Sequence, residues 1–377
     1  MRIIVFGGAG DMGSRAVEDL AAEEGVEQVT IADRDRPAAE KVAAGQRGNR
    51  SRVDVRTVDA NDPKALVDAM RGYDVVASAL GPFYRFELEL AKAAIEAGVD
   101  YASICDDWSA AQEVLDELDS PARAAGRTII TGLGTSPGLS NVVIKYLAGQ
   151  MDRARRADVS IYQPLNGGGG EAVLKHMMYV VSGDVPAWRQ GRQVMAPACS
   201  ESKLVRFPRF GRVKVWNMGH TEPVTIPRFI SDIEECNFFM GFGRGAGLFI
   251  WPAQRGMFKS DRRIDFVARQ LARIERLTSG QEAAPGGLRV DVWGEKDGQE
   301  VHRMVCGLGR MREATALCLS AGVQMLGRKN LSVSDGGAYA PEACLDPETL
   351  VSAMRAKGVE AFEDLGMTKP VAGAEPH

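Results

Sequence analysis

The sequence has no paired cysteines, few histidines and no dominant sign of charge. Its six cysteines form no CxxC pair, which argues against a zinc ribbon and a disulfide scaffold. The four histidines show no metal-ligand spacing, so we expect no metal. A net charge of −4 and a pI near 5.8 argue against nucleic acid as the main partner.

Long hydrophobic runs are also missing. The most apolar candidate, Phe238–Trp251, is interrupted by Arg244 and several glycines, so we expect no membrane span. We expect that segment to pack internally or at a subunit interface. The first apolar residues form a short strand rather than a secretory signal. With cysteine usage typical of a reducing compartment, these features favour a cytoplasmic protein.

The chain is long enough for two domains, at 377 residues. Strand and helix patterns alternate through residues 1–150, which predicts a Rossmann-type α/β domain with a doubly wound parallel sheet. After Arg153 the patterns favour a second α+β domain with a mixed or antiparallel sheet, over residues 151–312. Helical patterns return over residues 313–367, and residues 368–377 are expected to be disordered.

Individual elements of the second half can be predicted from local signals. Asp297-Gly298 separates two alternating runs and predicts a tight hairpin turn. Lys203–Phe207 and Val213–Trp216 predict another strand pair. Apolar spacing predicts helices over Asp261–Leu277 and Pro347–Lys357.

The opening strand leads into a glycine turn, Gly7-Gly8-Ala9-Gly10-Asp11-Met12-Gly13. In a dinucleotide-binding turn of this kind, Gly8 permits the sharp bend, Gly10 leaves room for a pyrophosphate, and Gly13 lets the helix approach the strand. The start of that helix offers unpaired N–H groups to an anion. We therefore predict that Gly8–Gly13 bind a dinucleotide, with a tight turn that binds no ligand as the alternative.

The acid expected near the adenosine ribose is Asp33, just after the second strand. Its carboxylate can accept hydrogen bonds from ribose hydroxyls, which favours NAD. The neighbouring Arg34 can pair with a 2′-phosphate or stack on adenine, which keeps NADP open. The sequence thus predicts NAD or NADP.

Together with the glycine turn Gly7–Gly13, four further segments resemble the saccharopine dehydrogenase family, and the resemblance spans nearly the whole chain. They are Ala79–Tyr84, Gly132–Asn141, Gly219–Val224 and Gly337–Glu342. The resemblance implies an NAD(P)-dependent oxidoreductase that oxidises or forms a C–N bond of an amino acid, amine or imine. It also implies that residues 315–365 fold back onto the first domain and that the middle domain binds substrate.

Loops at the carboxyl ends of parallel strands hold the ligand in such sheets. We expect Ala79, Leu80 and Gly81 to touch the cofactor, and Phe83 and Tyr84 to line the substrate site. Phe83 could equally pack in the core, whereas the polar tip of Tyr84 could reach a substrate carboxylate.

The fifth strand is followed by two acids, Asp106 and Asp107. Asp106 is the first candidate for holding a substrate ammonium or taking its proton. Related reductases, by resemblance, also place a substrate-binding acid at this strand end. The alternative for Asp107 is that it caps the helix beginning near Ser109.

A second glycine-rich loop precedes a helix at Leu139. Its start could bind a substrate carboxylate, so Ser136, Pro137, Gly138 and Asn141 are further substrate candidates. Gly167–Gly170, before a helix predicted over Glu171–Val181, could do the same or act as a hinge.

His220 is a candidate proton carrier, with a structural histidine as the alternative. His176, in a predicted element of the same domain, is the other interior histidine.

Three functions remain open on the sequence alone. The first is hydride transfer at a C–N bond, and the second is reduction of a C=C or C=O bond on the same fold. The third is a dinucleotide sensor without catalysis. A small-molecule substrate and a homodimer formed through the second domain are expected for the two enzymes.

Overall fold

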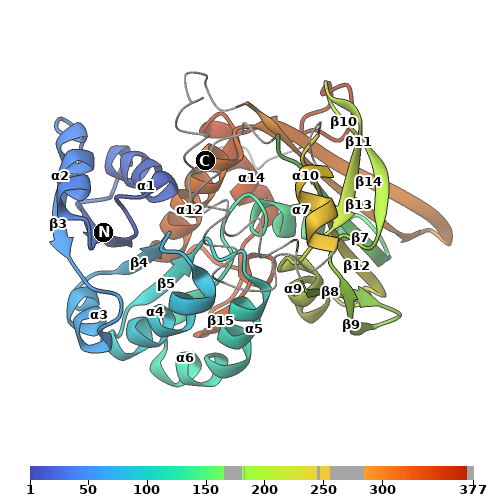
Figure 1. Cartoon of the computed structure of the whole chain (residues 1–377). Coiled ribbons are helices and arrows are strands. Elements are labelled where there is room, and N and C mark those ends of the chain that lie inside the picture. The colour runs from blue at the N-terminus through green and yellow to red at the C-terminus, as the bar shows by residue number, and fades with distance from the viewer. Residues whose placement is uncertain (165–180, 182, 244–246, 255–283, 372–377) are drawn as a thin grey trace. The chain divides into compact units, whose positions relative to one another are not determined.

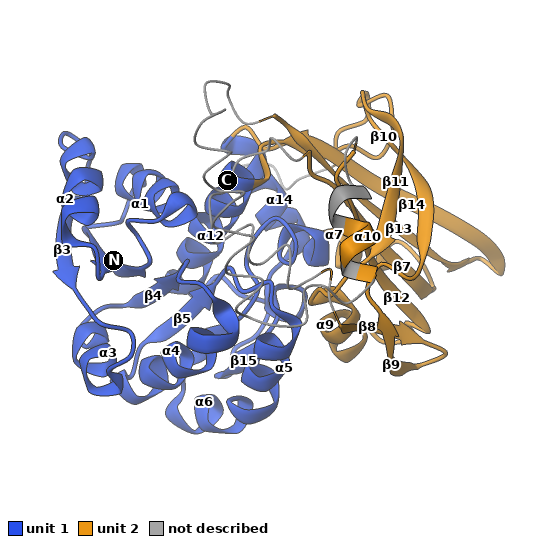
Figure 2. Ribbon diagram, in the orientation of Figure 1, with its two compact units in different colours: residues 1–142, 312–357 blue, residues 143–311, 358–377 orange. Residues whose placement is uncertain are grey.

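The computed structural model describes residues 1–164, 181, 183–243, 247–254 and 284–371. The chain divides into two compact units, each formed from two stretches of sequence (Figures 1 and 2). Unit 1 comprises Met1–Val142 and Arg312–Lys357, and unit 2 comprises Val143–Met311 and Gly358–His377. The units are therefore described separately.

Unit 1 contains a seven-stranded parallel sheet in the order β15-β6-β5-β4-β1-β2-β3. The central strands are fully buried apolar runs such as Ile3-Ile4-Val5-Phe6, as expected for strands covered on both faces. The strands are β1 (Arg2–Phe6), β2 (Gln28–Asp33), β3 (Arg52–Thr57), β4 (Val75–Ser78), β5 (Asp100–Ser103), β6 (Thr128–Ile130) and β15 (Gly337–Tyr339). The predicted doubly wound parallel sheet is confirmed.

Helices alternate with these strands. They are α1 (Asp11–Ala22), α2 (Arg36–Gly45), α3 (Pro63–Met70), α4 (Phe83–Ala97), α5 (Trp108–Glu117), α6 (Asp119–Ala125) and α7 (Leu139–Ala148), followed later by α12 (Met311–Gly327), α13 (Pro341–Cys344) and α14 (Pro347–Ala356). The helix that begins after Asp107 ends at Glu117, and α6 follows as a separate helix, because Pro121 lacks an N–H and cannot continue the hydrogen-bond ladder.

Residues 312–357 are integrated into unit 1 (Figure 2). β15 extends the sheet beyond β6, and α12 lies against α1, where Ser320 Oγ donates to Asp19 at 2.6 Å. Lys357 Nζ also binds Asp19, at 2.6 Å. Three further helices pack side by side, with α4 between α3 and α5. The sheet is therefore completed by a segment more than 150 residues away in sequence.

Unit 2 is built on a mixed sheet whose described strands run β10-β11-β12-β7-β13-β14, with β8 and β9 attached at β12. β12 pairs with β7 in parallel, and the other pairs are antiparallel. The strands are β7 (Arg153–Tyr162), β8 (Asp184–Arg189), β9 (Arg192–Pro197), β10 (Ser202–Phe207), β11 (Gly211–Asn217), β12 (Glu235–Gly241), β13 (Gly286–Lys296) and β14 (Gln299–Gly309).

Both predicted hairpins are present. Asp297 and Gly298 adopt φ values of 51° and 72° between β13 and β14, the left-handed pair that a tight hairpin turn requires. β10 and β11 form the second strand pair. Two helices are described beside this sheet, α9 (Glu222–Phe229) and α10 (Gly247–Gln254).

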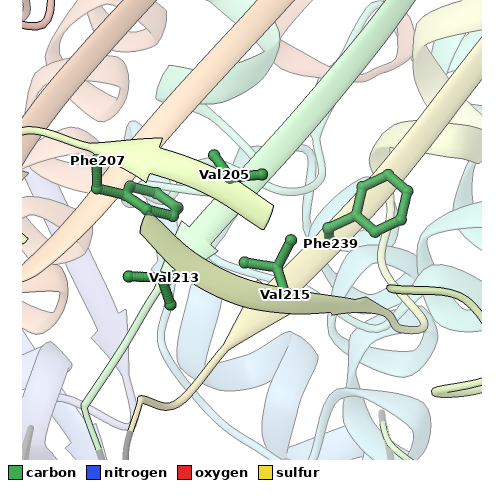
Figure 3. Packing of buried hydrophobic residues seen from close by; sticks show 5 residues of the cluster. All are labelled: Val205, Phe207, Val213, Val215 and Phe239. Carbon is green, nitrogen blue, oxygen red and sulfur yellow. The ribbon is translucent and has the colours of Figure 1, made fainter. Parts of the chain in front are cut away.

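A cluster of apolar side chains packs on three neighbouring strands of this sheet (Figure 3). It comprises Val205 and Phe207 from β10, Val213 and Val215 from β11, and Phe239 from β12. Phe238, on the next position of β12, is also buried. Among the described residues of the apolar segment Phe238–Trp251, Phe242 and Ile250 are also buried, whereas Trp251 is 55% exposed.

The last described residues belong to unit 2. Phe362 forms a backbone bridge to Cys306, and Val371 N donates to Ala361 O at 2.9 Å. Residues 368–371, which we expected to be disordered, are held here in part because Thr368 and Lys369 donate to the Asp364 carboxylate.

Candidate active site

The glycine turn after β1 is shaped first by Gly7. Its φ of +69° lies in the left-handed region, and an added Cβ would lie 2.8 Å from the carbonyl oxygen of Ala79. The sharp bend predicted at Gly8 lies at Gly7 instead, because the φ of Gly8 is not positive. At Gly8 a Cβ would instead press on Val5 O at 3.0 Å and Ile31 Cγ2 at 3.1 Å.

The start of α1 has the form of an anion site. A Cβ at Gly13 would lie 2.1 Å from Gly7 O, so helix and turn are in direct contact there. At Gly10 a Cβ would meet only Gly7 O, at 3.2 Å, and no side chain caps the helix. Within the described residues, no hydrogen bond engages the N–H groups of Asp11, Met12 or Gly13. These groups and the bare backbone at Gly10 fit a diphosphate.

Asp33, at the end of β2, is fixed against this turn. Its Oδ2 accepts a hydrogen bond from Ala9 N at 3.2 Å, and its Oδ1 accepts one from Asp35 N at 3.1 Å. The neighbouring Arg34 is exposed, and its positive charge acts on Asp59. The pKa of Asp59 is lowered mainly by hydrogen bonds from Asn61, with a smaller contribution from the charge of Arg34. Asp33 and Arg34 thus both lie at the end of β2, where the adenosine of a dinucleotide is expected.

The loop after β4 lies next to the glycine turn, because β4 pairs with β1 and Ala79 N donates to Phe6 O at 2.9 Å. Ala79 and Leu80 are half-buried, and Gly81 is exposed. Phe83 packs partly against Cys105, Ala110 and Ala111, the alternative considered above. Tyr84 is 61% exposed.

The two acids after β5 have different surroundings. Asp107 is buried and caps α5, where its Oδ1 accepts hydrogen bonds from Ser109 N at 3.1 Å and Ala110 N at 3.4 Å. This confirms the capping alternative for Asp107. Asp106 is half-buried and is not part of that cap. Of the two acids, Asp106 therefore remains the candidate for a chemical role.

The loop Gly132–Asn141 is closely packed on itself. Leu139 N donates to Gly134 O, Ser140 N to Thr135 O, and Gly138 N to Asn141 Oδ1 at 3.1 Å. Three N–H groups expected to face a substrate therefore have partners inside the loop. Substrate contact by Ser136, Pro137, Gly138 and Asn141 stays a prediction.

Two distant residues hold this loop in place. Asn141 Nδ2 donates to Glu342 Oε2 at 3.0 Å in the protein interior, and the hydroxyl groups of Thr135 and Thr315 lie 3.0 Å apart. Sequence reasoning missed both partners, although Glu342 ends one of the segments quoted for the family resemblance.

Unit 2, described by itself, contains a buried pair of His220 and Glu222. His220 Nδ1 lies 2.5 Å from Glu222 Oε2, and both side chains are almost fully buried. The imidazole stacks on Phe238 with ring centroids 3.8 Å apart and an interplanar angle of 7°. Glu222 was not singled out from the sequence, although an acid two residues from a candidate histidine is a readable signal. Such a carboxylate orients the imidazole and fixes its tautomer.

The same unit holds two buried carboxylates at paired positions of β7 and β13, Asp158 and Asp291. Asp158 binds Arg156 and Lys203, and Asp291 binds Arg289 and His302. Burial alone raises the pKa of each carboxyl, but these hydrogen bonds and positive charges outweigh burial, so both pKa values are lowered.

Several sequence predictions lie outside the described residues. They are Gly167–Gly170, His176, the helix over Asp261–Leu277, and, apart from Val181, the helix over Glu171–Val181. In the part of the chain that is described, no three His, Cys, Asp or Glu side chains gather to hold a metal ion. None of the described helices is both long and apolar enough to cross a bilayer.

The candidate cofactor residues therefore follow three adjacent strands, β4, β1 and β2, with Asp106 after the next strand, β5. Comparison with known proteins relates this part of the chain to a family. Residues 3–130 match the family model described as the saccharopine dehydrogenase NADP binding domain. Over these residues the chain is similar to the NADP-binding domain of that family. The predicted resemblance is confirmed, as is the prediction of NAD or NADP as the cofactor.

Two curated relatives extend beyond this domain. The chain is 26% identical to carboxynorspermidine synthase of Vibrio cholerae serotype O1 over 263 residues, 63% of this chain and 62% of that protein. It is 26% identical to a trans-acting enoyl reductase of Mycobacterium leprae over 196 residues, 50% of this chain and 47% of that protein. The chain thus spans between about half and 62% of these relatives.

The fold of the whole chain is shared with saccharopine dehydrogenase (L-Glu forming) from Saccharomyces cerevisiae. The TM-score is 0.70, with 95% of this chain and 98% of that chain covered, at 14% sequence identity. At this identity the likeness concerns the fold alone.

Proposed function

We propose that this chain is an NAD(P)-dependent oxidoreductase that transfers hydride at the C–N bond of an amino acid, amine or imine. Dinucleotide binding is supported by one observation. The start of α1 has no side-chain cap and lies beside bare backbone at Gly10, with Asp33 fixed next to it. The assignment of hydride transfer to a C–N bond rests on the chemistry implied by the resemblance and on the relative named carboxynorspermidine synthase.

The residues have distinct roles in this proposal. The N–H groups of Asp11, Met12 and Gly13 bind the diphosphate, and Asp33 binds the adenosine ribose. A bound nicotinamide supplies or accepts the hydride. Asp106 holds the substrate nitrogen or its proton, and His220, oriented by Glu222, is a second proton carrier. Tyr84 and the loop around Ser136 orient the remainder of the substrate.

A second candidate is reduction of a C=C bond, because other relatives carry the name trans-acting enoyl reductase. Carbonyl reduction belongs to the same class of alternative. A dinucleotide sensor without catalysis is the third candidate, and tight cofactor binding without turnover would identify it.

The test is a substrate-class screen that follows nicotinamide absorbance. Oxidation of amino acids and amines with NAD⁺ or NADP⁺, and reduction of imines formed from an aldehyde and an amine, should change it. Enoyl esters and thioesters form the second arm, and ketones the third. Turnover only in the second or third arm would overturn the C–N assignment, and binding without turnover in any arm would favour the sensor.

A matched pair of variants separates chemistry from folding. Asp106→Asn should lower kcat with little change in melting temperature, because Asp106 does not cap the helix. Asp107→Asn keeps a side-chain oxygen for the N-cap and should retain both properties. Unchanged kcat in Asp106→Asn would remove Asp106 from the proposal.

We also propose that the protein is a cytoplasmic homodimer that pairs through unit 2. Support comes from cysteine usage and from the exposed Trp251 of α10. Sedimentation of the purified chain tests the dimer, and a monomer at micromolar concentration would contradict it.

A further inference from the structure

A carboxylic acid lies in the interior of unit 1, where the site loops begin. Glu87, in the second turn of α4, has no exposed surface. Three hydroxyl groups donate to it: Ser103 Oγ to Oε1 at 2.5 Å, Thr131 Oγ1 to Oε1 at 2.9 Å, and Tyr101 OH to Oε2 at 2.9 Å. Burial raises the pKa of Glu87, and these hydrogen bonds offset only part of that rise.

Two of the three donors, Ser103 and Thr131, stand at the carboxyl ends of two neighbouring strands. Tyr101 and Ser103 belong to β5, and Thr131 directly follows β6. Glu87 therefore connects the starts of the loop that carries Asp106 and the loop that begins at Gly132. A single side chain of α4 is thus hydrogen-bonded at both loop starts.

The hydrogen bonds continue from these strand ends into the loops. Ser103 Oγ accepts from Cys105 N at 3.4 Å, and Cys105 immediately precedes Asp106. Ser103 O accepts from Leu133 N at 2.6 Å. The connections thus reach the loops after β5 and β6.

Packing alone does not explain an acid at this position. The other buried residues of α4 are Leu90, Ala91, Ala93 and Ala94, and burying a carboxyl group is costlier than burying an apolar one. A fully bonded polar group inside a core fixes one arrangement of its neighbours, whereas apolar contacts tolerate sliding.

We propose that Glu87 is a positioning residue that fixes the loops following β5 and β6, and with them Asp106, for the reaction. This rests on the proposed function for its catalytic part. Glu87 acts through Tyr101, Ser103 and Thr131, so its removal moves the loops rather than removing a reacting group.

The experiment compares Glu87→Gln, Glu87→Met and the control Leu90→Met. Gln keeps a side-chain oxygen and an N–H for the hydroxyls, Met fills similar volume without them, and Leu90 is a fully buried apolar residue of the same helix. Amide hydrogen exchange of residues 104–108 and 131–138 is measured together with nucleotide affinity, kcat and KM.

We expect Glu87→Met to speed exchange in both segments and to lower kcat by about 10-fold or more, as misplaced reacting groups do, with nucleotide affinity nearly unchanged. Glu87→Gln should restore both readouts, and Leu90→Met should alter neither. Wild-type exchange and kcat in a folded Glu87→Met variant would overturn the proposal.

Two other variants test the proposal if Glu87→Met does not fold. Ser103→Ala and Thr131→Val each remove one donor, and each should speed amide hydrogen exchange in the loop that follows the altered residue. Failure of both to do so would contradict the proposal. The exchange measurement needs no substrate, so it distinguishes failure of the positioning role from failure of the proposed function.

Discussion

The carboxylate of Asp33 accepts a hydrogen bond from the backbone N–H of Ala9, with 3.2 Å between Oδ2 and the nitrogen. This bond joins the end of β2 to the glycine turn after β1. It holds a negative charge beside the start of α1, where the adenosine ribose of a dinucleotide would lie.

The position of Asp33 predicts how its replacement changes cofactor choice. Asp33→Asn should weaken NADH binding by about 1.5–3 kcal/mol, the value of a hydrogen bond to a charged group, and should weaken NADPH binding less. Arg34→Ala is the matched control and should weaken only NADPH. Fluorescence titration of both nucleotides measures this, and equal losses for the two in Asp33→Asn would contradict it.

The contact between Gly13 and Gly7 predicts a stability effect. Gly13→Ala would place a Cβ 2.1 Å from Gly7 O, so the helix must move away from the turn, at a cost of about 1–3 kcal/mol. Gly45→Ala, at the exposed end of α2 with nothing within 4 Å, should be neutral or slightly stabilising. Thermal unfolding of both variants checks this prediction, which fails if their melting temperatures agree.

The lowered pKa values of Asp158 and Asp291 predict a pH dependence. Groups whose pKa is lowered on folding stabilise the protein above their ordinary pKa of 3.8, and this contribution is lost as pH falls through the lower folded value. Wild type should therefore exceed the double variant Asp158→Asn and Asp291→Asn in melting temperature at neutral pH.

That difference should shrink below about pH 4. Melting curves of both proteins between neutral and acidic pH measure it. A difference that stays constant over this range would show that the two carboxylates do not contribute in their charged form.

Local patterns in the sequence predicted much of unit 1 and both described hairpins. Continuous apolar runs identify β1 and β2, the glycine turn identifies the start of α1, and the pair Asp297-Gly298 identifies its hairpin turn, because each signal lies within a few residues of the element it controls. The break between α5 and α6 also has a local signal, Pro121.

Contacts between distant residues were not predictable in the same way. Glu342 reaches Asn141 across 201 positions, and Glu87 reaches Thr131 across 44. Such pairs depend on strand order, which a single sequence does not specify. The turn also shows that a glycine string alone does not tell which member has positive φ, since it is Gly7 and not Gly8.

The cap formed by Asp107 predicts a purely structural effect. Asp107→Ala should destabilise the protein by about 1 kcal/mol, because Ser109 N and Ala110 N lose their acceptor. Asp107→Ser should recover most of that loss. Thermal unfolding measures the change, and a large loss of turnover at unchanged melting temperature would instead place Asp107 in the chemistry.

Dinucleotide binding at the start of α1 is tested most directly by titrating wild type and Gly10→Ala with NADH and with NADPH. A Cβ at Gly10 makes one tight contact, with Gly7 O at 3.2 Å, which a small shift of the turn relieves, and it occupies the space in which the diphosphate would lie. Wild type should bind at least one nucleotide. Gly10→Ala should keep its melting temperature and lose on the order of tenfold in affinity, about 1.4 kcal/mol. Equal affinity of the two proteins, or no binding to wild type, would contradict the account.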